Sequence, residues 1–176
     1  VGAFFFGGCG VVSVTGTCVA SFTTETTAAE VTLDNSSTEI GQSFSITANA
    51  VPTRAQIKLK GVGSTTGTLI LKIEGNSAGN TPDDVTLATA TLDATTVVST
   101  TAAYYTFTFA TAPGLAANTT YWLRFKGSSL SSTNAVQWFG NNDGAYARGS
   151  ASIYSSSTWS SGVVGANRDF FFLLGC

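Results

Sequence analysis

The chain has 176 residues and a formal net charge of −2, and only 10% of its residues are charged. A domain of this length buries enough surface for one core, so we expect a single folded domain. The eight basic residues are scattered singly, which excludes the basic stripe that binding to nucleic acid requires. The chain contains no run of about 18 apolar residues, so no membrane span is expected.

Polarity in this sequence comes from hydroxyl groups more than from ions. The chain contains 20 Ser and 28 Thr together with 19 Gly, 12 Phe and only 3 Pro. Because β-branched and aromatic side chains suit a pleated, half-buried surface, this composition predicts an all-β fold.

The first residues, Val1–Val14, form an apolar arm without any charge. Two apolar runs, Val1–Phe6 and Val11–Val14, flank the glycine-rich residues Gly7–Gly10, which allow a bend or a close backbone approach. We expect residues 1–20 to form the arm and residues 21–176 to form a β-sandwich domain. The arm residues expected to bind a neighbouring subunit are Val1, Phe4, Phe5, Phe6, Val11, Val12 and Val14.

An extended apolar arm has two possible partners. It can add a strand to the sheet of another copy of the chain, and such a head-to-tail contact repeats into a filament. Alternatively, it is the first strand of its own sandwich. The chain lacks Met and begins with Val1, so we expect that a secretory leader has been removed and that the protein is extracellular, at the cell surface.

Three cysteines, Cys9, Cys18 and Cys176, lie near the two ends of the chain. In an exported protein they allow one internal disulfide, or a bond between subunits. Cys9 with Cys18 would close a short loop, whereas either of them with Cys176 would clamp the two termini together. Buried free thiols are the alternative. Three thiols without any His leave a zinc site one ligand short, so we expect no metal and no cofactor.

From about residue 20 onward, short β-rich segments alternate with Gly, Asn, Ser or Pro. The predicted strands are Val19–Thr23, Ala29–Leu33, Ile40–Thr47, Ala55–Lys60, Thr68–Glu74, Val85–Leu92, Tyr104–Ala110, Thr120–Lys126, Ala135–Phe139, Ala145–Tyr154 and Asp169–Leu174. The connections are too short for crossover helices, so we expect an antiparallel two-sheet sandwich.

Aromatic residues alternate with polar ones in Tyr105–Phe109 and Tyr121–Phe125, which predicts that these rows line the core between the sheets. Trp122 is out of phase with its row and should point away from that core. The apolar run Phe170–Leu174 is typical of a strand that is buried on both faces, for example one covered by the arm.

The segment 42–172 resembles extracellular jelly-roll sandwiches of the carbohydrate-binding-module type, which occur in bacterial and archaeal surface proteins and in phage tail proteins. The resemblance implies a jelly-roll fold, and the N-terminal arm lies outside it. The matching pieces are Gln42–Phe44, Ala55–Lys60, Val62–Gly63, Leu87–Ala94, Tyr104–Phe109, Thr119–Phe125, and Trp138 ahead of Gly144–Tyr146.

We expect no catalytic residues. The absence of His excludes Ser-His-Asp and Cys-His nucleophiles. The only adjacent carboxylates, Asp83 and Asp84, follow Pro82 in a predicted loop, where consecutive side chains diverge. The turn Asn141–Gly144 is rich in oxygen ligands for calcium, but we interpret it as a hairpin turn.

Aromatic residues near loops offer a second kind of site. Trp138, Tyr146 and Trp159 are the candidates for a platform on which sugar rings stack, although aromatic residues on strands more often belong to a core. Asn35 and Asn118 each begin an N-glycosylation pattern at a predicted loop or strand edge.

These patterns favour a structural subunit of an extracellular, pilus-like filament or another surface assembly. Its partners would be other copies of the same chain, joined by donation of the N-terminal strand. The alternative is a carbohydrate-binding module of a secreted or virion protein, with glycans as its partners and the arm packed onto its own domain.

Overall fold

The structure of the protein is a computed structural model that describes residues 18–98, 101–160 and 168–176. The predicted arm, Val1–Val14, and Cys9 lie outside the described residues, so the predictions made for them stay predictions. The predicted boundary between residues 20 and 21 falls inside the first described strand.

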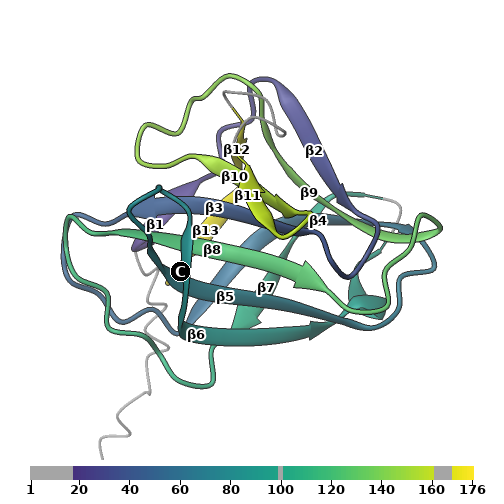
Figure 1. Cartoon of the computed structure of the whole chain (residues 1–176), viewed down its shortest axis with the longest axis horizontal. Helices are drawn as coiled ribbons and strands as arrows, with labels where there is room; N and C mark the ends of the chain where they lie inside the picture. Colours follow the sequence, from purple (N-terminus) through teal and green to yellow (C-terminus); the bar gives the residue numbers. More distant parts are fainter. Residues whose placement is uncertain (1–17, 99–100, 161–167) are drawn as a thin grey trace, which may run out of the picture.

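The described residues form two antiparallel sheets with only one short helical turn, η1 (Ala94–Thr96) (Figure 1). Sheet A contains β1 (Ala20–Phe22), β2 (Ala28–Leu33), β4 (Arg54–Gly63), β7 (Ala103–Thr108), β9 (Asn134–Asn141), β12 (Asp169–Phe170) and β13 (Phe172–Leu174). Sheet B contains β3 (Glu39–Ser45), β5 (Thr68–Asn76), β6 (Pro82–Asp93), β8 (Thr120–Gly127), β10 (Ala151–Ser155) and β11 (Thr158–Ser160).

The strand pairing is that of a jelly roll. In sheet B, β3 pairs with β8 and β5 pairs with β6, while in sheet A β2 pairs with β9 and β4 pairs with β7. The strands of the first half thus meet those of the second half in reverse order, as in one long hairpin rolled across two sheets. The predicted all-β, antiparallel two-sheet sandwich of jelly-roll type is confirmed.

The core lies between the two sheets and is built by alternation along the strands. In β4 every second residue is buried. Phe107 of β7 and Leu123 and Phe125 of β8 are fully buried, as predicted for the two aromatic rows. The rings of Phe107 and Phe125 meet edge to face across the core, with their centroids 6.1 Å apart.

Two predicted strands differ in the structure. The segment predicted as Ala145–Tyr154 becomes a strand only at Ala151, because the preceding residues turn. The N–H of Tyr146 donates to Asp169, and Gly149 packs so closely on the carbonyl of Ser43 that a Cβ there would lie 1.8 Å from the oxygen. A side chain at this position would therefore collide with β3.

The predicted strand Asp169–Leu174 is interrupted at Phe171, which is fully buried. The N–H of Phe171 donates to the carbonyl of Phe139 in β9. The carbonyl of Phe171 accepts from the backbone N–H of Lys58 in β4 and from the indole N–H of Trp138. The C-terminal run therefore fills the gap where β4 and β9 diverge, pairing with β9 through β12 and with β4 through β13. Strand β11 was not predicted, since only three residues form it.

Candidate functional site

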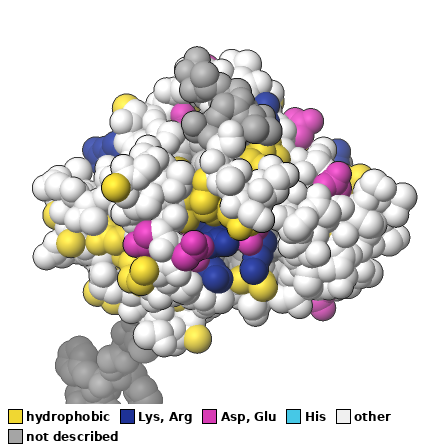
Figure 2. Space-filling view, viewed as in Figure 1, with side chains coloured by type: hydrophobic (Ala, Val, Ile, Leu, Met, Phe, Trp, Pro, Cys, Tyr) yellow, Lys and Arg dark blue, Asp and Glu magenta, His cyan; other side chains and the backbone are white. Residues whose placement is uncertain are grey.

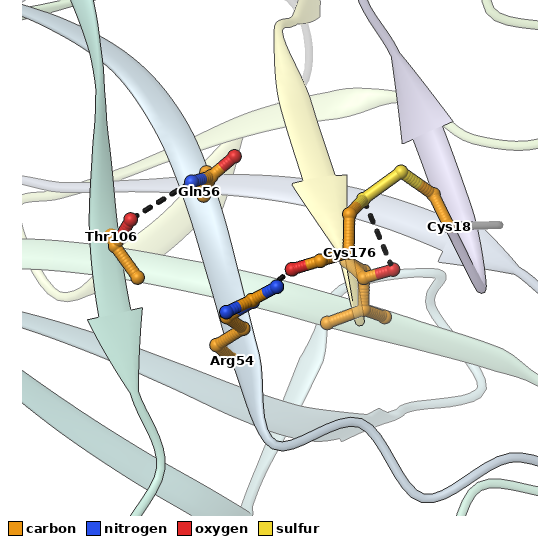
Figure 3. The surroundings of a disulfide bond; sticks show 6 residues. Cys18, Arg54, Gln56, Thr106 and Cys176 are labelled. Carbon is orange, nitrogen blue, oxygen red and sulfur yellow. Dashed lines mark hydrogen bonds between the residues drawn. A yellow bond between two sulfur atoms is a disulfide. The ribbon is translucent and has the colours of Figure 1, made fainter. Parts of the chain in front are cut away.

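The two ends of the described domain are joined covalently. Cys18 forms a disulfide with Cys176, one of the pairings that the sequence allowed (Figure 3). Next to it, β1 pairs with β13, and the N–H of Val19 donates to the carbonyl of Leu174. Arg54 of β4 holds the same corner, because its side chain donates to the carbonyl of Cys176. The residue from which the predicted arm departs is thus fixed to the C-terminus.

Near this corner sheet A has the strand order β1, β13, β4, β7 (Figure 3). Residues 55–57 of β4 pair with both β13 and β7, so these two strands lie on opposite sides of β4. The side chain of Gln56 donates to Thr106 of β7 at 2.8 Å. Strand β1 and strand β7 therefore form opposite margins of this part of the sheet.

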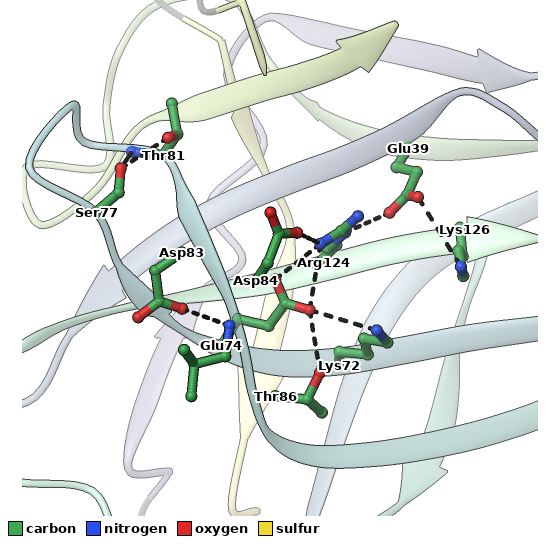
Figure 4. Close-up of polar contacts among 11 residues, drawn as sticks. Glu39, Lys72, Glu74, Ser77, Thr81, Asp83, Asp84, Thr86, Arg124 and Lys126 are labelled. Carbon is green, nitrogen blue, oxygen red and sulfur yellow. Dashed lines mark hydrogen bonds and ion pairs between the residues drawn. The ribbon is translucent and has the colours of Figure 1, made fainter. Parts of the chain in front are cut away.

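The outer face of sheet B carries a cluster of opposite charges, which we call the Arg124 cluster (Figures 2 and 4). It consists of Arg124 and Lys126 of β8, Lys72 and Glu74 of β5, Glu39 of β3 and Asp84 of β6. The guanidinium of Arg124 contacts all three carboxylates, including Glu74 at 3.0 Å. Three positive and three negative side chains make the cluster neutral overall.

Burial shapes the electrostatics of the Arg124 cluster. The side chain of Glu74 is 0% exposed and that of Arg124 is 11% exposed. Burial alone would lower the pKa of Arg124, but its hydrogen bonds to Glu39, Glu74 and Asp84 outweigh this and raise it. Arg124 therefore stays charged and holds Glu74 in place, which is a structural task.

Beside the cluster lies a hollow of about 520 Å³ that opens on the same face. Trp159 stands next to Trp122 there, with ring centroids 6.4 Å apart, and the guanidinium of Arg124 lies 5.4 Å from the Trp159 ring. The indole N–H of Trp159 is buried and has no hydrogen-bond partner among the described residues. The hollow is lined by Gly79, Asn80, Thr81, Trp122, Ser150, Ala151, Trp159 and Ser160.

The structure does not bring the three predicted sugar-binding aromatics together. Trp138 is fully buried, stacks on Phe170 with centroids 4.8 Å apart, and donates its N–H to Phe171. Tyr146 is 8% exposed and packs against Phe22 and Phe172. Buried rings offer no face to a sugar, so of the three candidates only Trp159 stays a candidate. Trp138 belongs to the core because its position in β9 faces the opposite sheet.

Trp122 points away from the main core, as its phase along β8 predicted. It is nevertheless fully buried, because Trp159 and Gly41 cover it on the outer face of sheet B. Its indole N–H donates to the side chain of Asn76 at 2.7 Å. A Cβ on Gly41 would lie 3.0 Å from the Trp122 ring, so glycine leaves room for the indole.

Tyr146 and Asp169 form a buried polar pair at the end of the core. Burial raises the pKa of Tyr146 to about 12, with an opposing effect of Arg148 and a further rise from Asp169. Burial also raises the pKa of Asp169, although the Tyr146 N–H and Gln42 donate to its carboxylate. The hydroxyl of Tyr146 has no partner among the described residues.

The two glycosylation candidates lie in turns. Asn35 is half-buried, and its side-chain oxygen accepts from Ser37 and Thr38. Asn118 is exposed just before β8, with a positive φ of 56°. In the turn at Asn141–Gly144, Asp143 accepts from the N–H of Ala145. The predicted hairpin turn is wrong, because the turn leads from β9 in sheet A to β10 in sheet B and the two strands do not pair.

The sequence alone does not predict the Arg124 cluster. The alternation in β8 already placed Arg124 on the face opposite Leu123 and Phe125. Its carboxylate partners, however, come from β3, β5 and β6, which lie up to 85 residues away in the sequence. Only the order of the strands in sheet B brings them together.

Searches against protein-family models and curated proteins found no match for this chain. Within the residues that the structure describes, no helix has the length and the apolar character needed to cross a membrane. The resemblance to carbohydrate-binding-module-like domains therefore stays a prediction.

Proposed function

We propose that this protein is a structural subunit of an extracellular assembly, in which the N-terminal arm of one copy adds a strand to the sandwich of another. The Cys18–Cys176 disulfide is the observation that carries the proposal. A disulfide is typical of oxidising surroundings outside the cytoplasm.

The disulfide strengthens the connection between the arm and the domain against a pulling force. Strand β1 has only three residues, and its ladder with β13 alone would peel apart under a pull on the arm. Cys18 transfers such a pull to Cys176, at the end of a segment that pairs with both β4 and β9. A load on the arm is thus carried by the middle of sheet A.

The arm itself has the composition of a donated strand. Main-chain hydrogen bonds give such a strand its affinity, and alternate side chains give it specificity. Burying about four of its Val and Phe side chains would contribute on the order of 8 kcal/mol before the cost of ordering the arm.

The test compares three proteins: the full chain, a variant lacking residues 1–14, and a control in which these residues are replaced by a Gly/Ser segment of equal length. We expect negative-stain microscopy and sedimentation to show polymers for the full chain only. Polymers that form equally well without the arm, or a full chain that stays monomeric at every concentration, would contradict the proposal.

A carbohydrate-binding role is the second candidate, and the hollow beside Trp159 favours it. Its half-buried indole ring, beside the hollow, offers a stacking face to a neutral sugar. Affinity electrophoresis with immobilised polysaccharides tests this role. We expect Trp159→Ala to abolish retention and Trp159→Phe to keep part of it, whereas equal retention of both variants and the wild type would exclude Trp159.

A further inference from the structure

The margins of the two sheets differ in how well they are protected against an added strand. Natural edge strands avoid unwanted pairing by being short, by carrying charges, or by bulging. Three edge strands of the described sandwich, β1, β11 and β12, have only two or three residues. Strand β2 carries Glu30 in its middle.

Strand β6 is long but is protected against an added strand by charges and by an irregular register. Asp83 and Asp84 stand near its start and Asp93 at its end. Its pairing with β5 also shifts register twice, between Ile73 and Asn76. Such irregularities twist an edge away from a partner.

Strand β7 has none of these protections. Its six residues, Ala103–Thr108 (AYYTFT), contain no charge, no Pro and no Gly. They pair with β4 in one continuous register, and the other side of β7 has no strand partner among the described residues. It is the one described edge strand that is uncharged, regular and longer than three residues.

The peptide groups available at this edge can be assigned. The N–H of Phe109 donates to Thr53, just before β4. Because backbone groups alternate along a strand, Ala103, Tyr105 and Phe107 also face β4. The N–H and C=O groups of Tyr104, Thr106 and Thr108 therefore point outward.

Building on the proposed function, we propose that the β7 edge is the acceptor for the segment Val1–Phe6 of a second copy. This segment has six residues and no charge, which matches β7 in length and character. The eleven residues from 7 to 17 span at most about 36–40 Å when extended, enough to reach a neighbouring molecule.

The placement of the two margins suits a head-to-tail contact with a second copy. The arm departs at Cys18, beside β1, whereas the acceptor edge of β7 lies on the far side of β13 and β4 (Figure 3). Three strand spacings, about 14 Å, separate β1 from β7. When the arm leaves the domain at one margin and the acceptor strand lies at the opposite margin, the contact between copies is head-to-tail. Such a contact repeats into a filament.

Cysteine pairing points the same way. Because Cys18 and Cys176 are bonded to each other, a disulfide between Cys9 and another cysteine of residues 1–176 would have to join two copies.

Cross-linking between two labelled full-length proteins tests the acceptor. One carries Phe5→Cys and the other Thr106→Cys, both also carry Cys9→Ser, and a size tag on one distinguishes heterodimers from homodimers. With a short bismaleimide reagent, we expect at least tenfold more heterodimer than with Thr89→Cys, a matched exposed position on β6. Melting curves verify that each variant folds.

Each result decides the acceptor separately from the proposed function. Cross-linking to Thr89→Cys in place of Thr106→Cys, in a protein whose polymers still require residues 1–14, overturns the β7 acceptor and leaves the proposed function intact. Polymers that do not require residues 1–14 overturn both. A chain carrying Phe5→Cys and Thr106→Cys together that closes only within one molecule overturns the second copy as the partner.

Discussion

The outer face of sheet B and the β7 margin of sheet A both meet solvent, yet they are built in opposite ways. On sheet B, Arg124 and its carboxylates satisfy one another across four strands. On the β7 margin, six uncharged residues leave every second peptide group without a strand partner in the described structure. A surface whose polar groups are satisfied stabilises the domain, whereas one with unpaired backbone groups is available to a partner.

The disulfide fixes Cys18, from which the predicted arm departs, on the margin opposite β7. It closes a loop with a sequence separation of 158 residues. Replacing Cys18 and Cys176 by Ser should lower the free energy of unfolding by roughly 2–5 kcal/mol, measured by urea denaturation. Cys9→Ser is the control and should leave the unfolding curve of the monomeric protein unchanged. A loss equal to that of the control would contradict the structural role of the bond.

The Arg124 cluster should matter for folding and not for assembly. Arg124→Met leaves the buried carboxylate of Glu74 without its main partner, so we expect a loss of about 3 kcal/mol in urea denaturation. Lys126→Met is the matched control, since its ion pair with Glu39 is longer, at 3.9 Å, and more exposed. The control should change stability by less than about 1 kcal/mol. Equal effects of the two variants would refute the assigned role.

The β7 margin should show the reverse pattern. Thr106→Lys places a charge on the acceptor edge, so we expect the concentration needed for assembly to rise about tenfold, which corresponds to about 1.4 kcal/mol. Its unfolding free energy should change by less than about 1 kcal/mol, because Thr106 is exposed and loses only the hydrogen bond from Gln56. Sedimentation at graded concentrations measures the shift. Thr89→Lys on β6 should assemble like the wild type, and an equal shift for both variants would count against β7.

Tyr146 gives the smallest expected effect at neutral pH. Its hydroxyl lacks a partner in the described structure, so Tyr146→Phe should change the unfolding free energy by less than about 0.5 kcal/mol. Burial raises the pKa of Tyr146 to about 12, above the value of about 10 expected for an unfolded chain. The wild type should therefore lose stability between pH 10 and pH 12, and the variant should lose less. Parallel stability profiles over this range would contradict the raised pKa.

Alternation within a single strand made part of the fold predictable. The rows ending in Phe109 and Phe125 identified core strands, and the phase of Trp122 placed its ring outside the main core. The partners of a residue across the sheet could not be predicted. The position of Trp138 near a loop in the sequence predicts an accessible ring, whereas Phe170 and Phe171 enclose it from the other end of the chain.

The candidate sites were predictable to a similar extent. The cysteines near both ends predicted a clamp as one option, and the structure selected Cys18 with Cys176. The composition of β7 was visible in the sequence as an aromatic row. Its position at a sheet margin was not, because an edge is defined by the strand that is missing beside it.

Amide hydrogen exchange tests the central claim most directly, because it reports on the β7 backbone itself. We compare the assembled full chain with the variant lacking residues 1–14. We expect slower exchange in the assembly at Tyr104, Thr106 and Thr108, whose N–H groups point outward, and little change at Tyr105 and Phe107, which already face β4. Identical exchange along β7 in both proteins would contradict strand addition at this edge.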